Sequence, residues 1–152
     1  MLKNRSCRRA LSAFGGVLIL AGAGTTGTAL ATPFRAALTG AAEVPAGDPD
    51  GAGTATIRVD GTLNDVCVDL EVSGIGPATA AHIHRGAAGE NGPPVVNLDV
   101  PDGEDEDESD CDHVGDALAD DIRRNPGGFY VNVHTAEFPE GAIRGQLVPS
   151  AD

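Results

Sequence analysis

Three histidines stand at spacings that could bring their imidazole rings together. His82 and His84 are two residues apart in the segment AHIH, and His134 ends the segment FYVNVH, in which polar and apolar residues alternate. Because residues two apart on a β-strand project from the same face, His82 and His84 are expected on one side and Ile83 on the other. Three imidazole nitrogens with an open coordination position suit zinc or copper. If the two segments lie near each other in one sheet, the pattern predicts a metal site formed by His82, His84 and His134.

Two further residues could border this site. Asn132 lies on the same side of its expected strand as His134, and Arg144 follows the polar alternation of the segment GAIRGQL. The sequence favours the simpler interpretation that the histidines hydrogen-bond to loop backbone, with Arg144 in an exposed ion pair worth at most about 1 kcal/mol. His113 lies beside Cys111 and a run of acids. We expect His113 in a loop, outside the site.

Catalytic groups are harder to find in the sequence. No nucleophile with a partnered base is apparent, and no glycine-rich phosphate loop follows a strand. No pair of carboxylates stands out from the general acidity of the chain. A binding or structural role is therefore favoured over catalysis.

Short strands must position these side chains. Runs of alternating polar and apolar residues recur between clusters of Gly, Pro and Asp, a pattern typical of a sandwich or barrel. One helix is expected where Val114, Leu118 and Ile122 repeat at a spacing of four. We predict an all-β, Greek-key-like sandwich or barrel of about seven strands, with one short helix before the penultimate strand and a tight hairpin turn at Asp60-Gly61. The expected strands are residues 34–39, 52–60, 63–73, 80–84, 94–99, 128–134 and 142–148.

The segment DGEDEDESDCD, residues 102–112, concentrates negative charge. Carboxylates this close together repel one another in a compact element, so we predict a solvated acidic loop. Calcium binding is the alternative, but the spacing of the acids differs from that of an EF-hand loop.

Two cysteines lie beyond the N-terminal segment, Cys67 and Cys111. In an exported protein they are expected to form a disulfide, worth about 4 kcal/mol for a loop of roughly 45 residues. A thiolate metal or redox site is the alternative, although neither cysteine has a close partner such as a C-x-x-C pair provides.

The N-terminal residues have the pattern of a signal peptide. The first nine residues include four basic ones, an apolar stretch follows, and small residues precede Thr32. We predict a signal peptide over residues 1–31, cleaved after Ala31, with export by the general secretory route; Arg8-Arg9 leaves the twin-arginine route open. The mature chain, residues 32–152, is then expected to be secreted and extracellular, without a membrane anchor.

Charge narrows the range of partners. Because residues 1–31 carry four basic and no acidic side chains, their removal lowers the formal net charge from −13 to about −17. A surface this acidic repels nucleic acid and anionic lipid. We therefore expect no nucleic-acid partner, and an extracellular ligand or protein whose identity the sequence does not specify.

Four segments of the chain closely resemble the CHRD (chordin-type) domain. They are AALTGAAEVP, AGTATIRVDG, AAHIHRGAAGENGPPVV and FYVNVHTAEFPEGAIRGQL, in this order. The resemblance covers nearly all of residues 32–152. It implies a β-sandwich-like extracellular module, found in bacterial secreted proteins and, as repeats, in chordin, which sequesters bone-morphogenetic growth factors. The residues that match the family motif are His82, His84, Gly86, His134, Gly141, Arg144 and Gly145.

The chain also departs from chordin. It resembles a single-domain bacterial secreted member, with one copy of the domain and none of the cysteine-rich modules that accompany it in chordin. Growth-factor binding is therefore not expected of it. The resemblance implies a secreted binding or structural module of undetermined ligand.

A second resemblance is to copper-zinc superoxide dismutase. That family also carries an H-x-H strand, a later strand histidine on the outside of a β-barrel and an arginine near the metal, but the ligands of its zinc loop are missing here. The alternative function is therefore a copper- or zinc-dependent oxidoreductase of superoxide-dismutase-like architecture.

Overall fold

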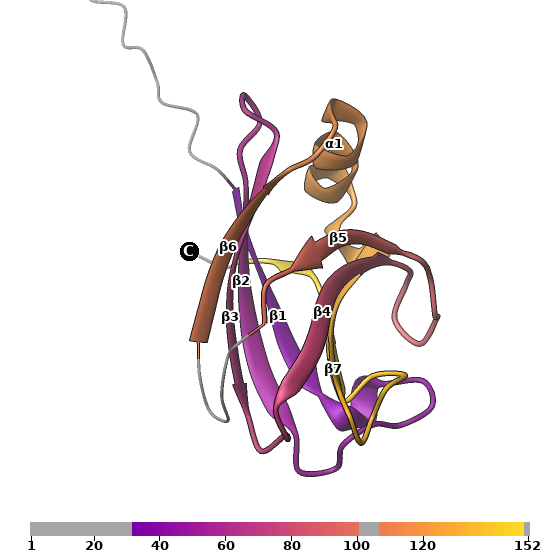
Figure 1. Ribbon diagram of the computed structural model, residues 1–152. Coiled ribbons are helices and arrows are strands. Elements are labelled where there is room, and N and C mark those ends of the chain that lie inside the picture. The colour runs from indigo at the N-terminus through magenta and orange to yellow at the C-terminus, as the bar shows by residue number, and fades with distance from the viewer. Residues whose placement is uncertain (1–31, 101–106, 151–152) are drawn as a thin grey trace, which may run out of the picture.

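A computed structural model of the protein describes residues 32–100 and 107–150, and the expected signal peptide with its cleavage site lies outside these residues. Strands form most of the regular structure (Figure 1). The strands are β1 (Thr32–Thr39), β2 (Ala52–Val59), β3 (Asp65–Ser73), β4 (Ala78–Arg85), β5 (Pro94–Leu98), β6 (Asp107–His113), β7 (Phe129–Thr135), β8 (Ile143–Gln146) and β9 (Val148–Pro149). The helices are α1 (Asp116–Arg124) and the 3-10 turns η1 (Gly40–Ala42) and η2 (Pro126–Gly128).

The strands form one antiparallel sheet that curls into a nearly closed barrel. Their order is β5-β4-β7-β8-β1-β2-β3-β6, with β9 paired to β1. The two edge strands, β5 and β6, contact each other across the remaining gap. The connection from β3 to β4 crosses between the two sides of the barrel, and α1 covers one end of it (Figure 1). The predicted all-β class is confirmed.

Alternation along the strands places one set of side chains inside the barrel. Ile57 of β2, Ile83 of β4 and Val131 of β7 are all fully buried in one hydrophobic core. α1 adds Ala119 and Ile122 to the same core. Burying aliphatic side chains of this size stabilises the fold by roughly 1.5–3 kcal/mol each. The barrel therefore supplies a rigid support for the side chains on its outside.

The described residues form nine strands, where about seven were expected. The segment 142–148 divides into β8 and β9, because Leu147 leaves the ladder and its side chain is fully buried. As a result, α1 precedes the third strand from the end instead of the penultimate one. The predicted hairpin is confirmed, since β2 pairs with β3, but its connection is longer than the tight turn expected at Asp60-Gly61. The loop runs from Asp60 to Asn64, and the Asp60 carboxylate accepts hydrogen bonds from the Thr62 and Leu63 amides.

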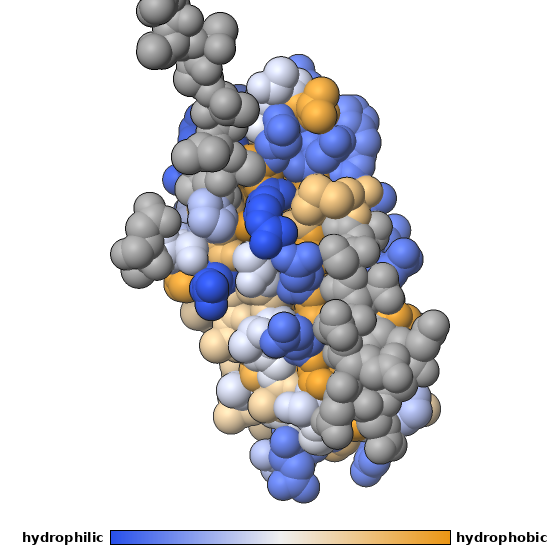
Figure 2. All heavy atoms as spheres, turned by 90° about the vertical axis from the view of Figure 1, so that its left-hand side faces the viewer, coloured by the Kyte–Doolittle hydropathy of each residue, from blue (hydrophilic) through white to orange (hydrophobic). Residues whose placement is uncertain are grey.

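The prediction of a loop throughout residues 102–112 was wrong for its second half. Residues 107–113 form β6, which pairs with β3, while residues 101–106 lie outside the described residues. Pairing is possible because the ladder uses backbone groups alone, and charged side chains are well tolerated on an edge strand. Hydrophilic and hydrophobic residues are mixed over this side of the barrel (Figure 2).

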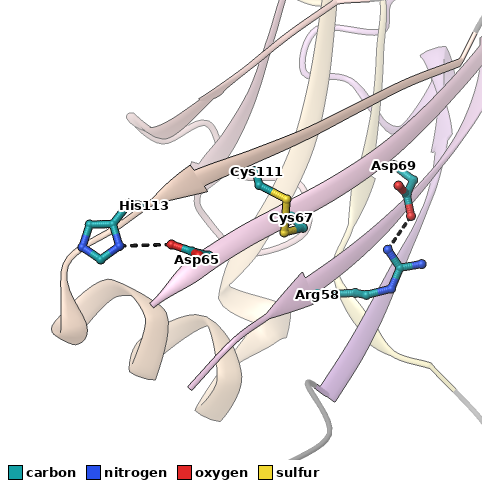
Figure 3. Close-up of a disulfide and its surroundings, with 6 residues drawn as sticks. All are labelled: Arg58, Asp65, Cys67, Asp69, Cys111 and His113. Atoms are coloured by element: carbon teal, nitrogen blue, oxygen red, sulfur yellow. Dashed lines mark hydrogen bonds and ion pairs between the residues drawn. A yellow bond between two sulfur atoms is a disulfide. The ribbon is translucent and has the colours of Figure 1, made fainter. Parts of the chain in front are cut away.

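The disulfide between Cys67 and Cys111 is confirmed. The two residues are direct partners in the register of β3 and β6, with their Cα atoms 4.0 Å apart. The bridge therefore fixes the edge strand β6 to its neighbour (Figure 3).

Candidate metal centre

A polar surface covers the outside of the barrel over β4, β7 and β8. The strand register places His82, Asn132 and Arg144 side by side in one row across the sheet. His84 and Tyr130 are partners in the next row. Adjacent residues on a β-strand point to opposite faces of the sheet. Because core residues such as Ile83 and Val131 point into the barrel, these side chains point out of it. The sheet register thus brings together residues that are up to 62 positions apart in the chain.

The three imidazoles predicted from the sequence lie against one another. His82 Nδ1 is 3.3 Å from His134 Nε2. Each of the three residues offers one ring nitrogen, and these nitrogens all lie within 4.8 Å of one another. All three side chains are half-buried. The rings therefore form a compact cluster that is open on one side to solvent.

His84 has one nitrogen held by backbone and one nitrogen free. Its Nδ1 is 2.8 Å from the carbonyl oxygen of Gly92, so Nδ1 carries the proton and donates. Its ring also stacks on Tyr130 with the centroids 4.9 Å apart. Nε2 is then an unprotonated acceptor, and it is buried without any hydrogen-bond partner. Such an unpaired buried acceptor is unfavourable by roughly 1–3 kcal/mol.

His134 is oriented in the same way. Its Nδ1 is 3.0 Å from the carbonyl oxygen of Pro139, to which it donates. Nε2 of His134 is therefore the acceptor in its contact with His82, and His82 donates from Nδ1. The lone pair of His84 Nε2 is thus left for a ligand, and the lone pairs of His134 Nε2 and His82 Nδ1 become available together when the His82 proton moves to its own Nε2.

The electrostatics of the cluster favour uncharged imidazoles. Burial lowers the pKa of His82, and repulsion from His134 and His84 lowers it further. Burial also lowers the pKa of His84, an effect that the hydrogen bond to Gly92 partly offsets. Neutral imidazole is the form that binds metal ions. Burial therefore favours the metal-binding form of His82 and His84.

The spacing of one pair of nitrogens fits a transition-metal ion. Zinc–nitrogen bonds of about 2.0–2.1 Å at tetrahedral angles place two ligand nitrogens about 3.3–3.4 Å apart, and the His82–His134 nitrogens are 3.3 Å apart. Ligating histidines usually donate their second N–H to a carbonyl or carboxylate, as His84 and His134 do here. Three nitrogens leave a fourth position open, and this donor set suits copper as well as zinc.

Arg144 does not make the exposed ion pair considered from the sequence. Its side chain is only 5% exposed and pairs with Glu43, which is 1% exposed, at 2.8 Å. Asn132 Nδ2 donates to the other oxygen of the same carboxylate. Burial raises the pKa of Glu43, which the Arg144 guanidinium only partly offsets. Both predicted border residues therefore hold a buried carboxylate beside the histidine cluster.

Glu43 is the residue that sequence reasoning missed. It follows η1 in a segment without alternation, and its partner Arg144 is 101 residues away. Gly141, with φ of 144°, makes room for it, since a Cβ there would lie 2.6 Å from the carboxylate. A lone acid in an otherwise apolar segment that includes residues 41–45, AAEVP, was the only available signal.

Residues 41–44 and 88–89, from two segments far apart in the chain, line a cavity together with Arg144 and Gln146. The cavity has a volume of about 330 Å³. Arg144, Glu43 and Gln146 provide its polar lining, and small residues provide the remainder. The lining residues are Ala41, Ala42, Glu43, Val44, Ala88, Gly89, Arg144 and Gln146.

His113 does not belong to the cluster. It ends β6 and is not in a loop, but its side chain is 73% exposed and its Nδ1 lies 3.1 Å from Asp65 (Figure 3). His113 therefore has the ordinary surroundings of a surface residue, in contrast to the other three histidines.

The fold and the polar surface define a small β-barrel module with a histidine cluster on its outside. A family model of the CHRD domain matches residues 34–147, and the chain therefore belongs to the CHRD domain family. CHRD domains are extracellular-type binding modules in general. No curated protein matches the chain. Among the described residues, no helix is long and apolar enough to cross a membrane.

Proposed function

We propose that this protein is a secreted CHRD module that binds one copper or zinc ion through His82, His84 and His134. The observation that carries the proposal is the buried, unpartnered Nε2 of His84, on a residue that offers one ring nitrogen to a group of three within 4.8 Å of one another. A metal ion would satisfy this acceptor and use the lone pair of His134 at the same time.

Secretion is supported by two features that do not depend on the site. The Cys67–Cys111 disulfide is typical of proteins that function in oxidising compartments. The chain also begins with the charge and hydropathy pattern of a signal peptide. The module would then meet its metal ion outside the cell.

The geometry supports binding better than it supports the oxidoreductase alternative. The guanidinium of Arg144 donates to Glu43, to the carbonyl oxygen of Glu90 and to Asn91 Oδ1. An arginine held by three partners is poorly placed to attract a substrate anion to the open coordination position. We therefore expect the metal-loaded protein to show no superoxide loss above that of free metal in a cytochrome reduction assay.

Titration calorimetry with zinc chloride tests the metal proposal. Wild type should bind one ion per chain, and His84→Ala should weaken the affinity by more than the 10–100-fold typical of losing a partner outside the ligand shell. His113→Ala is the matched control, because it removes an exposed histidine outside the cluster, and its affinity should equal that of wild type. The absence of zinc binding by wild type, or equal losses in the two variants, would overturn the proposal.

A further inference from the structure

The β4–β5 loop, residues 86–93, lies over the polar surface next to the histidine cluster. Its residues 87–91 are exposed, and the loop contributes no side chain to the hydrophobic core. A segment without buried apolar contacts opens locally at low free energy unless other interactions hold it. The order of this loop therefore depends on polar contacts.

Those polar contacts come mainly from the outer face of the barrel. The carbonyl oxygen of Gly92 accepts a hydrogen bond from His84 Nδ1 at 2.8 Å. The amide of Gly92 donates to the Tyr130 hydroxyl at 3.2 Å. Arg144 donates to Asn91 Oδ1 at 2.6 Å. Asn91 in turn donates to the carbonyl oxygen of Val44 at 2.7 Å, which ties the β4–β5 loop to the loop after η1.

We propose that His84 couples metal binding to closure of the β4–β5 loop. This inference rests on the metal site proposed above, and it assigns that site a regulatory role. The two ring nitrogens of His84 have different surroundings: Nε2 is buried without a hydrogen-bond partner and is left for a metal ion, and Nδ1 donates to the carbonyl oxygen of Gly92. Metal at Nε2 fixes the ring orientation and keeps the proton on Nδ1, which is the proton that the Gly92 carbonyl accepts.

Closure of this loop shapes the neighbouring cavity. Ala88 and Gly89 of the loop line the 330 Å³ cavity, as does Val44 from the loop after η1. Since Asn91 joins these two loops, an opened β4–β5 loop would expose the cavity and free the Arg144 side chain from two of its partners. Metal loading would therefore control access to a second, ligand-sized space.

Amide hydrogen exchange with and without zinc tests this coupling. The amides of Gly86, Glu90 and Gly92 are hydrogen-bonded and report on the loop. At free zinc of one hundred times the dissociation constant, their exchange should slow by tenfold or more, up to the roughly hundredfold limit set by linkage. The Asn64 amide, bonded to Asp60 in the β2–β3 loop, should not change.

Two variants separate the two functions of His84. His82→Ala removes a metal ligand but keeps the His84–Gly92 bond, so its metal-free loop should exchange like wild type and should not respond to zinc. His84→Ala removes a metal ligand and also the bond to Gly92, so the amides of its β4–β5 loop should exchange faster even without zinc. Equal exchange in the two metal-free variants would overturn the inference.

Different results would overturn the loop coupling and the metal site. If calorimetry on the same sample detects zinc binding while the Gly92 amide exchanges at an unchanged rate, the coupling is wrong and the metal site stands. If wild type binds no zinc, the metal proposal is wrong, and the inference falls with it.

Discussion

Two arginine–carboxylate pairs on opposite sides of the barrel have the same chemistry but different surroundings. Arg58 and Asp69, on β2 and β3, are 51% and 41% exposed (Figure 3), whereas Arg144 and Glu43 are 5% and 1% exposed. An exposed pair of this kind contributes roughly 0–1 kcal/mol. In a buried pair, each charge depends on its partner because water no longer solvates it. The side of the barrel that carries the histidine cluster (β4, β7 and β8, the histidine side) therefore holds a buried ion pair. The pair on the side that carries the disulfide (β2, β3 and β6, the disulfide side) is exposed.

The histidines repeat this contrast. His113 is exposed and meets a carboxylate at the surface, while His84 is half-buried with one nitrogen unpartnered. Where the disulfide side has a covalent bond to hold its edge, the histidine side has hydrogen bonds between side chains and loops. The two sides should therefore respond differently to mutation.

The largest effect is expected on the disulfide side. Replacing both bridging residues, as Cys67→Ser with Cys111→Ser, should lower the free energy of unfolding by about 4 kcal/mol, because the unfolded chain is no longer constrained. Urea denaturation of wild type and the double variant measures the difference. A loss below about 1 kcal/mol would mean that the pairing of β3 and β6 holds without the bridge.

The buried ion pair should give the next largest effect. Arg144→Ala should lower the free energy of unfolding by about 3 kcal/mol, at the lower end for a broken buried pair. The lower end is expected because Glu43, whose pKa is already raised by burial, can take up a proton and relieve the unpaired charge. Arg58→Ala is the control and should change the unfolding free energy by less than about 1 kcal/mol. Similar losses in the two variants would contradict the contrast between the two sides.

The pH dependence of stability should give a smaller effect. The pKa values of His82 and His84 are lowered in the folded state, so below about pH 6.5 the unfolded chain binds protons that the folded chain does not. Stability should therefore fall as the pH decreases from 6.5 toward the lowered values, by less than about 1.4 kcal/mol per pH unit for each histidine.

A variant isolates this contribution from that of other groups. His82→Gln with His84→Gln keeps the acids and Glu43, so the difference between its pH profile and that of wild type reports on the two imidazoles alone. Thermal denaturation of the metal-free proteins between pH 7 and pH 5 measures both profiles. Parallel profiles would contradict the lowered pKa values.

Much of the fold could be predicted from the alternation of polar and apolar residues, which follows from the local geometry of a β-strand. Ile83 and Val131 are in the core because the strands alternate, and the same rule placed His82, His84 and His134 outside it. That these histidines also lie close together depends on β4 pairing with β7, which is a long-range feature. The sequence pattern favoured this arrangement without determining it.

The residues that were missed depend on contacts between distant segments. Glu43 is buried by loops and by Arg144, and nothing in its own segment indicates that environment. β6 was missed for a different reason, because its acids predicted a solvated loop while its backbone had a partner in β3. In both cases, the position of the charged residues depends on a distant segment of the same chain, which their own segment does not reveal.

X-ray absorption spectroscopy of the zinc-loaded protein tests the central claim most directly. We expect the nearest shell to contain three imidazole nitrogens at about 2.0–2.1 Å, with the fourth position filled by a light atom from solvent. The His84→Ala protein should lose this signature, and His113→Ala should keep it. A shell of carboxylate oxygens without imidazole scattering, as the acidic surface alone would supply, would contradict the account.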